Sequence, residues 1–151
     1  MLVLLALCLS AAEPSAPTVS SVPAAVAIQI DAATIAWKDA PPTMPKGTQM
    51  AVLEGDPTQD GWFTVRLKVP KGFALGLHTH PLPERVTVLE GSISVGFDAT
   101  LDKKTARTFK AGAFYVNPPA VPHFVFSEDG CVIQITGVGP WKVVPAAPPV
   151  H

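Results

Sequence analysis

The sequence has few charged residues, few cysteines and no apolar run long enough to span a bilayer. Only 15% of its 151 residues are charged, against about a quarter in a typical soluble domain, and the formal net charge is −1. Lysine and arginine are scattered along the chain, so no nucleic-acid-binding surface is indicated. A length of 151 residues fits one domain and leaves no room for a second core of comparable size.

The longest apolar run is Met1–Leu9, which is shorter than the roughly 20 residues that a membrane-spanning helix needs. Ser10 and Ala12 are small residues at the −3 and −1 positions of a signal-peptidase site. We therefore predict a signal peptide over residues 1–12 and a periplasmic or secreted protein. A lipoprotein anchored at Cys8 is the less favoured alternative, because Leu7 stands where a lipidation motif needs a small residue.

Cysteine is scarce, and cleavage after Ala12 would leave only Cys131. One thiol cannot form an intrachain disulfide, so the fold does not depend on an oxidising compartment. Cys131 lies in a run typical of a strand, with no histidine near it in sequence, which favours a buried structural role.

Long helices are not expected, because 17 prolines and 11 glycines interrupt the chain too often. Short apolar segments separated by turn residues, such as Glu90-Gly91, indicate an all-β sandwich or barrel instead. We predict an N-terminal arm with the first strands over 13–46, a barrel over 47–141 and an extended tail over 142–151. The expected strands are 28–30, 49–53, 62–69, 74–80, 85–89, 92–97, 106–109, 113–116, 123–126 and 131–136, with a turn within 31–37.

Three of the four histidines and one glutamate have the spacing of a metal site. His78 and His80 are two residues apart, so on a strand both rings project from one face. Glu84 follows just past the end of that strand, and His123 can converge on the same point from another strand of a small barrel. Imidazole nitrogens with a carboxylate oxygen suit a divalent transition metal and suit calcium poorly.

The same residues resemble the signatures of the cupin superfamily. The first signature, G-x5-H-x-H-x3-E-x6-G, is complete from Gly72 to Gly91. The second, G-x5-P-x-G-x2-H-x3-N, keeps Gly112, Pro118 and His123 but has alanine at 120 and serine at 127. The resemblance covers residues 47–141 and is strongest to small single-domain bacterial cupins of the cupin type-2 kind, which share the Gly137–Trp141 ending.

This resemblance implies a single-domain cupin, a jelly-roll barrel also described as a double-stranded β-helix. It also implies one divalent metal ion (Fe, Mn, Ni, Cu or Zn) bound by His78, His80, Glu84 and His123. The expected function is that of a metal-dependent enzyme, dioxygenase-like or isomerase- or decarboxylase-like, acting on a small carboxylate or phenolic molecule. The alternative is a non-catalytic periplasmic protein that binds a metal or a small ligand.

The sequence indicates no separate catalytic base. Arg66, Gln134 and Tyr115 are candidates for the substrate pocket, because each lies on a predicted strand of the barrel. Cupins often form homodimers through their edge strands, and the need to cover an exposed edge is a physical reason to expect a homodimer here. The expected partners are therefore a small-molecule ligand and a second copy of the chain, without nucleic acid or a stable membrane span.

Overall fold

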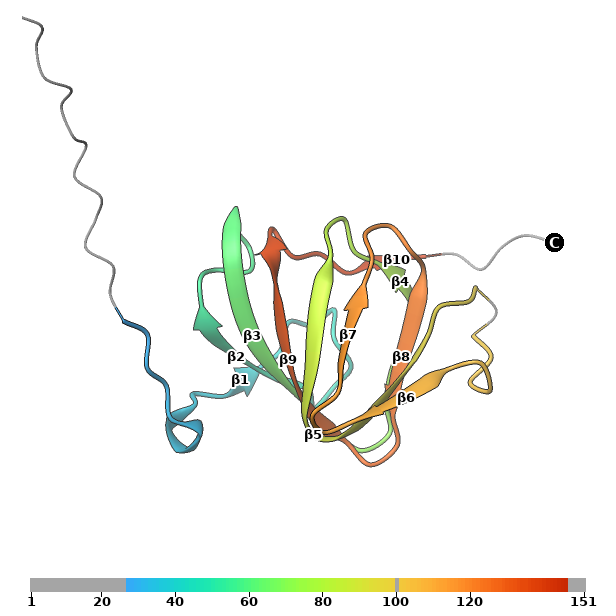
Figure 1. Ribbon diagram of the computed structural model, residues 1–151, viewed down its shortest axis with the longest axis horizontal. Coiled ribbons are helices and arrows are strands. Elements are labelled where there is room, and N and C mark those ends of the chain that lie inside the picture. The colour runs from blue at the N-terminus through green and yellow to red at the C-terminus, as the bar shows by residue number, and fades with distance from the viewer. Residues whose placement is uncertain (1–26, 100, 147–151) are drawn as a thin grey trace, which may run out of the picture.

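Antiparallel pairing joins ten strands into a sheet that curls into a barrel in the computed structural model, which describes residues 27–99 and 101–146 (Figure 1). The order is β1-β2-β3-β9-β5-β8-β4-β10, and β6 and β7 pair with β5. The strands are β1 (Lys38–Asp39), β2 (Gln49–Glu54), β3 (Gly61–Val69), β4 (Phe73–Thr79), β5 (Glu84–Gly96), β6 (Arg107–Lys110), β7 (Phe114–Asn117), β8 (His123–Ser127), β9 (Cys131–Gly139) and β10 (Val144–Pro145).

Strand β5 links the two halves of the barrel. Its first half pairs with β7 and β9, and its second half pairs with β6 and β8. We predicted that a turn at Glu90-Gly91 would separate two strands, and this prediction is wrong, because β5 continues through both residues. The register with β9 shifts between Val88 and Glu90, and Gly91 has φ +67°, so the chain bulges and bends while the strand continues.

Most of the other expected strands are present within one to three residues of their predicted bounds. The strand predicted over 28–30 is wrong, because Ile28 and Ile30 are exposed and unpaired with any described strand. The turn within 31–37 is confirmed as the short 3₁₀ helix η1 (Ala32–Thr34), where the Asp31 carboxylate accepts a hydrogen bond from the Ala33 amide.

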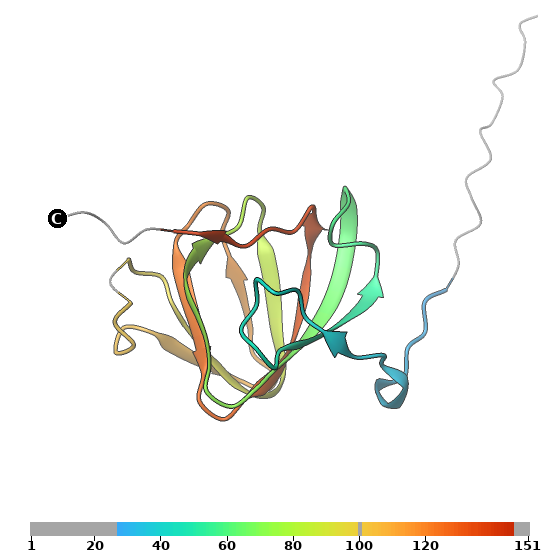
Figure 2. The ribbon, with the colours of Figure 1, turned by 180° about the vertical axis from the view of Figure 1, so that it is seen from behind.

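The barrel extends past the boundary expected at Trp141. β10 pairs with β4, Val144 opposite Thr79 and Pro145 opposite His78. Residues 139–146, which we call the C-terminal strap, thus cross the end of the barrel that carries the predicted metal ligands (Figure 2). The predicted signal peptide over 1–12 and the last residues of the tail lie outside the described residues.

Apolar residues alternate along the strands and turn inward. On β3 the buried set is Phe63, Val65, Leu67 and Val69, and on β9 it includes Ile133 and Ile135. Burial of Cys131 is confirmed, at 6% exposure, and burial raises the pKa of its thiol, which keeps it protonated. These residues form the apolar interior of the barrel, and some of them, including Leu67, Ile133 and Ile135, also line the cavity beside the histidines.

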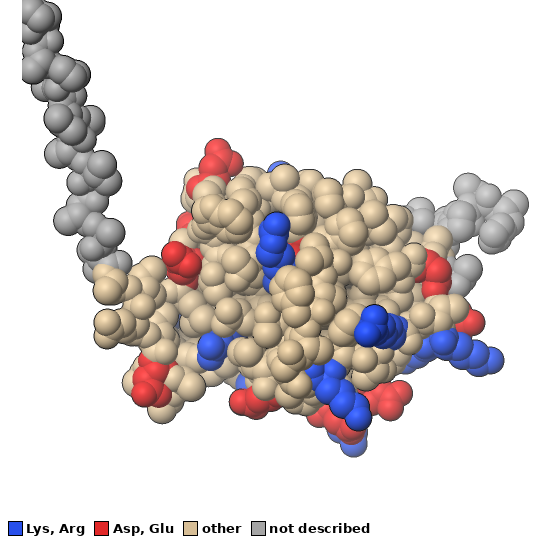
Figure 3. Space-filling view, viewed as in Figure 1, with Lys and Arg blue, Asp and Glu red and all other residues tan. Residues whose placement is uncertain are grey.

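The surface of the described residues carries mixed charge. On the face drawn in Figure 3, lysine and arginine are interspersed with aspartate and glutamate between uncharged regions. Among residues 27–99 and 101–146 there is no helix long and apolar enough to cross a membrane.

Candidate metal centre

Three histidines meet inside one end of the barrel. His78 lies near the end of β4, His80 directly follows that strand, and His123 begins β8, paired with His78. All three are buried, with exposures of 3%, 2% and 0%. Their ring centroids are 4.2 to 5.1 Å apart. The convergence predicted from the spacing of these histidines is therefore present.

Backbone carbonyls fix the orientation of each ring. Nδ1 of His78 lies 2.7 Å from the carbonyl oxygen of Gly76, Nδ1 of His80 lies 2.8 Å from that of Lys142, and Nδ1 of His123 lies 3.0 Å from that of Val121. A carbonyl oxygen only accepts hydrogen bonds, so Nδ1 carries the proton and Nε2 keeps a free lone pair. This is the tautomer that a metal ligand requires.

The three histidines are close enough together to share one ion. One ligand atom from each of the three histidines lies within 4.8 Å of those of the other two. Among the described residues, Nε2 of His80 and Nε2 of His123 are buried without a hydrogen-bond partner. Such orphaned acceptors are costly unless a cation or a donor binds them. The donor set therefore fits a divalent transition metal.

Burial keeps the imidazoles of His78 and His123 neutral at physiological pH. Desolvation, with a smaller contribution from the neighbouring His80, lowers the pKa of His78 to about 4. Desolvation likewise lowers the pKa of His123 to about 4, with added effects from His78 and His80. Both rings are consequently in the unprotonated form, which binds metal, at pH 7.

Glu84 lies beside the histidines at the start of β5, 6% exposed. Its Oε2 accepts a hydrogen bond of 2.6 Å from Nδ2 of Asn117 and lies 3.5 Å from Nε2 of His80. Its Oε1 accepts a hydrogen bond of 2.9 Å from Nε1 of Trp141. The carboxylate is thus fixed on both sides, although it is not among the ligand atoms that gather within 4.8 Å. Its role as a fourth ligand stays a prediction.

Sequence reasoning did not assign a role to Asn117 or Trp141. Asn117 is 1% exposed. It lies two residues after Tyr115 on β7, so both side chains point to the same, inward face, and this spacing could have indicated the position of Asn117 from the sequence. Trp141 is the last residue of the Gly-Val-Gly-Pro-Trp ending. Its ring stacks on His80 with centroids 6.4 Å apart and contacts Phe63 at 6.0 Å. Neither contact is local in sequence.

Of the three pocket candidates, only Tyr115 lines the cavity beside the histidines. Arg66 and Gln134 lie on the opposite face of β3 and β9, where Nε of Arg66 donates a hydrogen bond of 3.0 Å to Oε1 of Gln134. The apolar residues between them face inward, so these two side chains point outward. The cavity, of about 30 Å³, is lined by Met44, Leu67, Phe73, Leu75, His78, His80, Glu84, Ile93, Tyr115, Asn117, Val125, Ile133, Ile135, Trp141 and Val143.

Trp141→Phe is expected to weaken metal binding about tenfold, because the ring remains but the donor to Glu84 is lost. Outer-shell partners of this kind typically contribute ten- to a hundredfold to metal affinity. Competition with a chromophoric chelator measures the change. Trp62→Phe is the matched control, since Trp62 is 61% exposed and is not among the residues that line the cavity. Equal affinities for the two variants would show that the Trp141–Glu84 hydrogen bond does not support the metal site.

Ala120→Gly is expected to stabilise the protein. Ala120, which stands where the cupin signature has glycine, adopts φ +59°, and its amide donates a hydrogen bond of 2.8 Å to the carbonyl of His80. Relief of the left-handed strain should raise the free energy of unfolding by about 0.5–1 kcal/mol, or the melting temperature by about 2 °C. Ala74→Gly, in strand β4, is the control and should destabilise. A lower melting temperature for Ala120→Gly would contradict this account.

A jelly-roll barrel with inward-facing histidines clustered at one end defines a small cupin-superfamily protein. The chain belongs to the family described as "Domain of unknown function (DUF4437)", whose model matches residues 11–144. Together with the germin-like relatives and the cupin structures described next, this match confirms the resemblance and the fold class expected from the two signatures.

The curated relatives are similar over a short segment. Germin-like protein subfamily 2 member 4 of Arabidopsis thaliana is 42% identical over 53 residues, which is 34% of this chain and 24% of the relative. Member 2 of the same subfamily is 46% identical over 48 residues, 31% of this chain and 22% of the relative. The chain therefore spans about a quarter of the length of these relatives.

Solved structures share the fold at low sequence identity. The polyketide cyclase RemF from Streptomyces resistomycificus superposes with a TM-score of 0.64 at 17% identity, over 78% of this chain and 84% of that one. A putative acetylacetone dioxygenase from Methylibium petroleiphilum gives a TM-score of 0.62 at 18% identity, over 81% and 85%. An RmlC-like cupin from Shewanella frigidimarina gives 0.57 at 19%, over 72% and 87%.

Proposed function

We propose that this protein is a metal-dependent enzyme that acts on a small organic molecule, with a carboxylate or a phenol as the substrate class that the sequence predicts. The observation that carries the proposal is the convergence of His78, His80 and His123, each with Nδ1 hydrogen-bonded to a backbone carbonyl oxygen. Among the described residues, Nε2 of His80 and of His123 has no hydrogen-bond partner. When bound there, a divalent transition metal would supply a Lewis acid or a redox centre. Three protein nitrogens leave coordination positions open for a substrate.

The surrounding residues of the chain would prepare the site for chemistry. Hydrogen bonds from Asn117 and Trp141 hold the Glu84 carboxylate at a fixed position next to His80. Burial, with the nearby charge of Glu84 as a second cause, raises the pKa of Tyr115 well above its usual value, so its hydroxyl stays protonated. Aliphatic and aromatic side chains form most of the cavity wall and limit the entry of water.

Two of the solved neighbours, a polyketide cyclase and a putative acetylacetone dioxygenase, are described as enzymes of small organic molecules. Their identity to this chain is low, so they support the proposal only as activities that this barrel can accommodate.

Metal analysis combined with oxygen uptake tests the proposal. The purified protein, loaded with Fe, Mn, Ni, Cu or Zn in turn, should retain about one ion per chain after dialysis. Oxygen consumption or substrate loss is then followed with a panel of carboxylates and catechols. Full occupancy without turnover of any substrate would instead favour the non-catalytic binding protein. Failure to retain any metal would contradict the metal-dependent enzyme and also a binding protein whose ligand is a metal.

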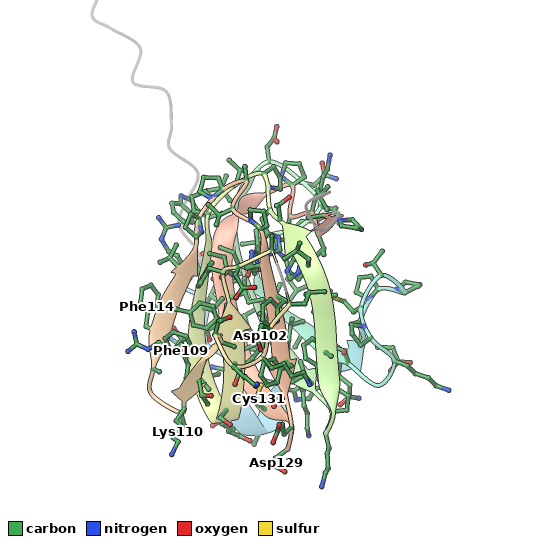
Figure 4. All side chains as sticks on the ribbon, turned by 90° about the vertical axis from the view of Figure 1, so that its right-hand side faces the viewer. Asp102, Phe109, Lys110, Phe114, Asp129 and Cys131 are labelled. Atoms are coloured by element: carbon green, nitrogen blue, oxygen red, sulfur yellow. The ribbon has the colours of Figure 1, made fainter. Side chains whose placement is uncertain are left out.

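We also propose export to the periplasm or the medium through residues 1–12, and a homodimer. Phe114, which is 57% exposed, projects from the outer face of β7 (Figure 4). Val116, two residues along the same strand, is 38% exposed, and covering both side chains would favour self-association. N-terminal sequencing of the exported protein tests export, and an intact residue 1 would contradict it. The mass measured by light scattering tests the homodimer, and a monomeric mass at high concentration would contradict that.

A further inference from the structure

One of the three histidines takes its orienting carbonyl from the C-terminal strap. For His78 and His123, the carbonyl that accepts from Nδ1 lies two residues earlier in sequence. For His80 it is the carbonyl of Lys142, 62 residues further along the chain and 2.8 Å away. The first two contacts are local, whereas the third exists only while the strap lies across the end of the barrel (Figure 2).

The part of the strap that follows Trp141, residues 142–146, has few bonds to the barrel. Its strand β10 is two residues long, exposed throughout, and lies at the end of the strand order with β4 as its one neighbour among the described strands. Strand β9, by contrast, pairs with β3 on one side and β5 on the other. Segments with few buried contacts open locally at a much lower free energy than such central strands.

Trp141 itself is anchored more firmly. Its amide donates a hydrogen bond of 2.6 Å to the carbonyl of Pro57, and its ring contacts Phe63 and His80. The boundary between the anchored and the weakly held part of the strap therefore falls just after Trp141, which makes this position the hinge.

With the strap in place, the cavity beside the histidines is too small for an organic substrate. Its volume is about 30 Å³, and a single water molecule needs roughly 10–15 Å³. Val143 of the strap lines this cavity and also an outer pocket of about 370 Å³, which Thr43, Leu75 and Pro145 help to line. Val143 thus stands between the two spaces, and its displacement would join them.

We infer that residues 142–146 are a lid over the candidate metal centre, latched by the hydrogen bond from Nδ1 of His80 to the carbonyl of Lys142. Opening the lid joins the cavity to the outer pocket and lets a metal ion or a substrate pass. Opening also removes the acceptor that orients His80 and that raises the basicity of its Nε2. Lid closure and metal binding therefore favour each other by the same factor, because such coupling is reciprocal. The inference rests on the proposed function and adds a route of entry to it.

A removable disulfide tests whether the lid is the route. Thr79 and Val144 lie opposite each other in the β4–β10 ladder, and neither lines the cavity. When both are replaced by cysteine, the oxidised full chain should release bound Zn²⁺ to a chromophoric chelator about tenfold more slowly than the same protein after reduction. Peptide mass spectrometry confirms that the intended bridge has formed. A release rate that is equal or faster in the oxidised protein would overturn the lid as the route.

Thr64→Cys combined with Thr136→Cys is the matched control for this disulfide. The two hydroxyl oxygens are 3.3 Å apart on the paired strands β3 and β9, so a bridge there crosses the sheet and leaves the strap unconstrained. Zinc release from the control should not depend on reduction. A control that slows release as much as the bridge in the strap would show that any added rigidity has this effect, and would overturn the lid.

Hydrogen exchange tests the opening and the latch without a variant. In the metal-free protein, the amide of Ala146, which donates to the carbonyl of Leu77, should exchange at least about tenfold faster than the amides of β9. One equivalent of Zn²⁺ should slow the exchange of Ala146 about ten- to 100-fold, the factor expected for an outer-shell contact. The amides of β9 should not change.

The outcomes of hydrogen exchange separate the lid, the latch and the proposed function. Exchange of Ala146 as slow as that of β9 in the metal-free protein would overturn the lid. Equal exchange of Ala146 with and without bound zinc would overturn the latch. Failure to retain zinc at all would contradict the proposed function together with the latch, and exchange in the metal-free protein would still decide whether the lid opens.

Discussion

Replacement of His123 by alanine is expected to lower the affinity for a divalent transition metal by at least about 100-fold. His123 is fully buried, and its Nε2 has no hydrogen-bond partner among the described residues. Loss of a direct ligand should exceed the ten- to hundredfold effect that is typical for an outer-shell residue. Metal content after dialysis, with chelator competition for the residual binding, measures the change.

Val125→Ala is the matched control for His123→Ala, because Val125 lies two residues further along β8 and is also buried. It removes side-chain volume from the same strand without removing a ligand. The control should lose about 1–3 kcal/mol of stability yet keep its metal. Thermal denaturation confirms that both variants fold. Retention of one ion per chain by a folded His123→Ala protein would contradict the three-histidine site.

Gly91→Ala is expected to reduce the free energy of unfolding by about 3 kcal/mol, the largest stability effect that we predict. Gly91 has φ +67°, and an added Cβ would lie 2.5 Å from the carbonyl oxygen of Gly130 and 3.2 Å from Cα of Cys131. The clash involves backbone on the paired strand β9, which cannot move aside without breaking the ladder. Denaturant titration followed by fluorescence measures the loss.

Gly72→Ala separates the clash from the backbone strain. Gly72 is the other glycine of the first cupin signature and has φ +74°, but an added Cβ would have no heavy atom within 4 Å. This variant should therefore lose only about 1 kcal/mol, which is the cost of the left-handed conformation. Equal losses for the two variants would show that the close approach at the bend of β5 is not what requires glycine at position 91.

The sequence predicted the histidine cluster because the relevant signals are local. A spacing of two on a strand puts His78 and His80 on one face whatever the rest of the chain does. Turn residues and alternating apolar residues likewise predicted most strands. The prediction of a turn at Gly91 was wrong because a glycine after a polar residue is compatible with two structures, a reversal of the chain and a bulge within a strand. Only pairing with both β8 and β9 distinguishes the two.

The positions of Arg66 and Gln134 show a second limit. Side chains alternate along a strand, so Arg66 lies on the opposite face of β3 from Val65. Val65 and its cross-strand partner Ile135 are apolar and therefore belong inside the barrel. Their neighbours Arg66 and Gln134 were thus to be expected on the outside. The pocket prediction gave this pattern too little weight. Burial of the apolar set inside the barrel is the stronger requirement, because each buried aliphatic side chain contributes roughly 1.5–3 kcal/mol.

The sequence by itself thus determined the all-β class, the cupin signatures and the identity of the three clustered histidines, because short-range periodicity and spacing encode each of them. Tertiary structure alone decided how Glu84 is held. Trp141 is 57 residues away from it and Asn117 is 33, and only closure of the barrel and the C-terminal strap brings their donors to its two oxygens. Tertiary structure also left Oδ1 of Asn117 buried without a hydrogen-bond partner among the described residues. No local pattern specifies a contact between segments that meet only when the two halves of a barrel close.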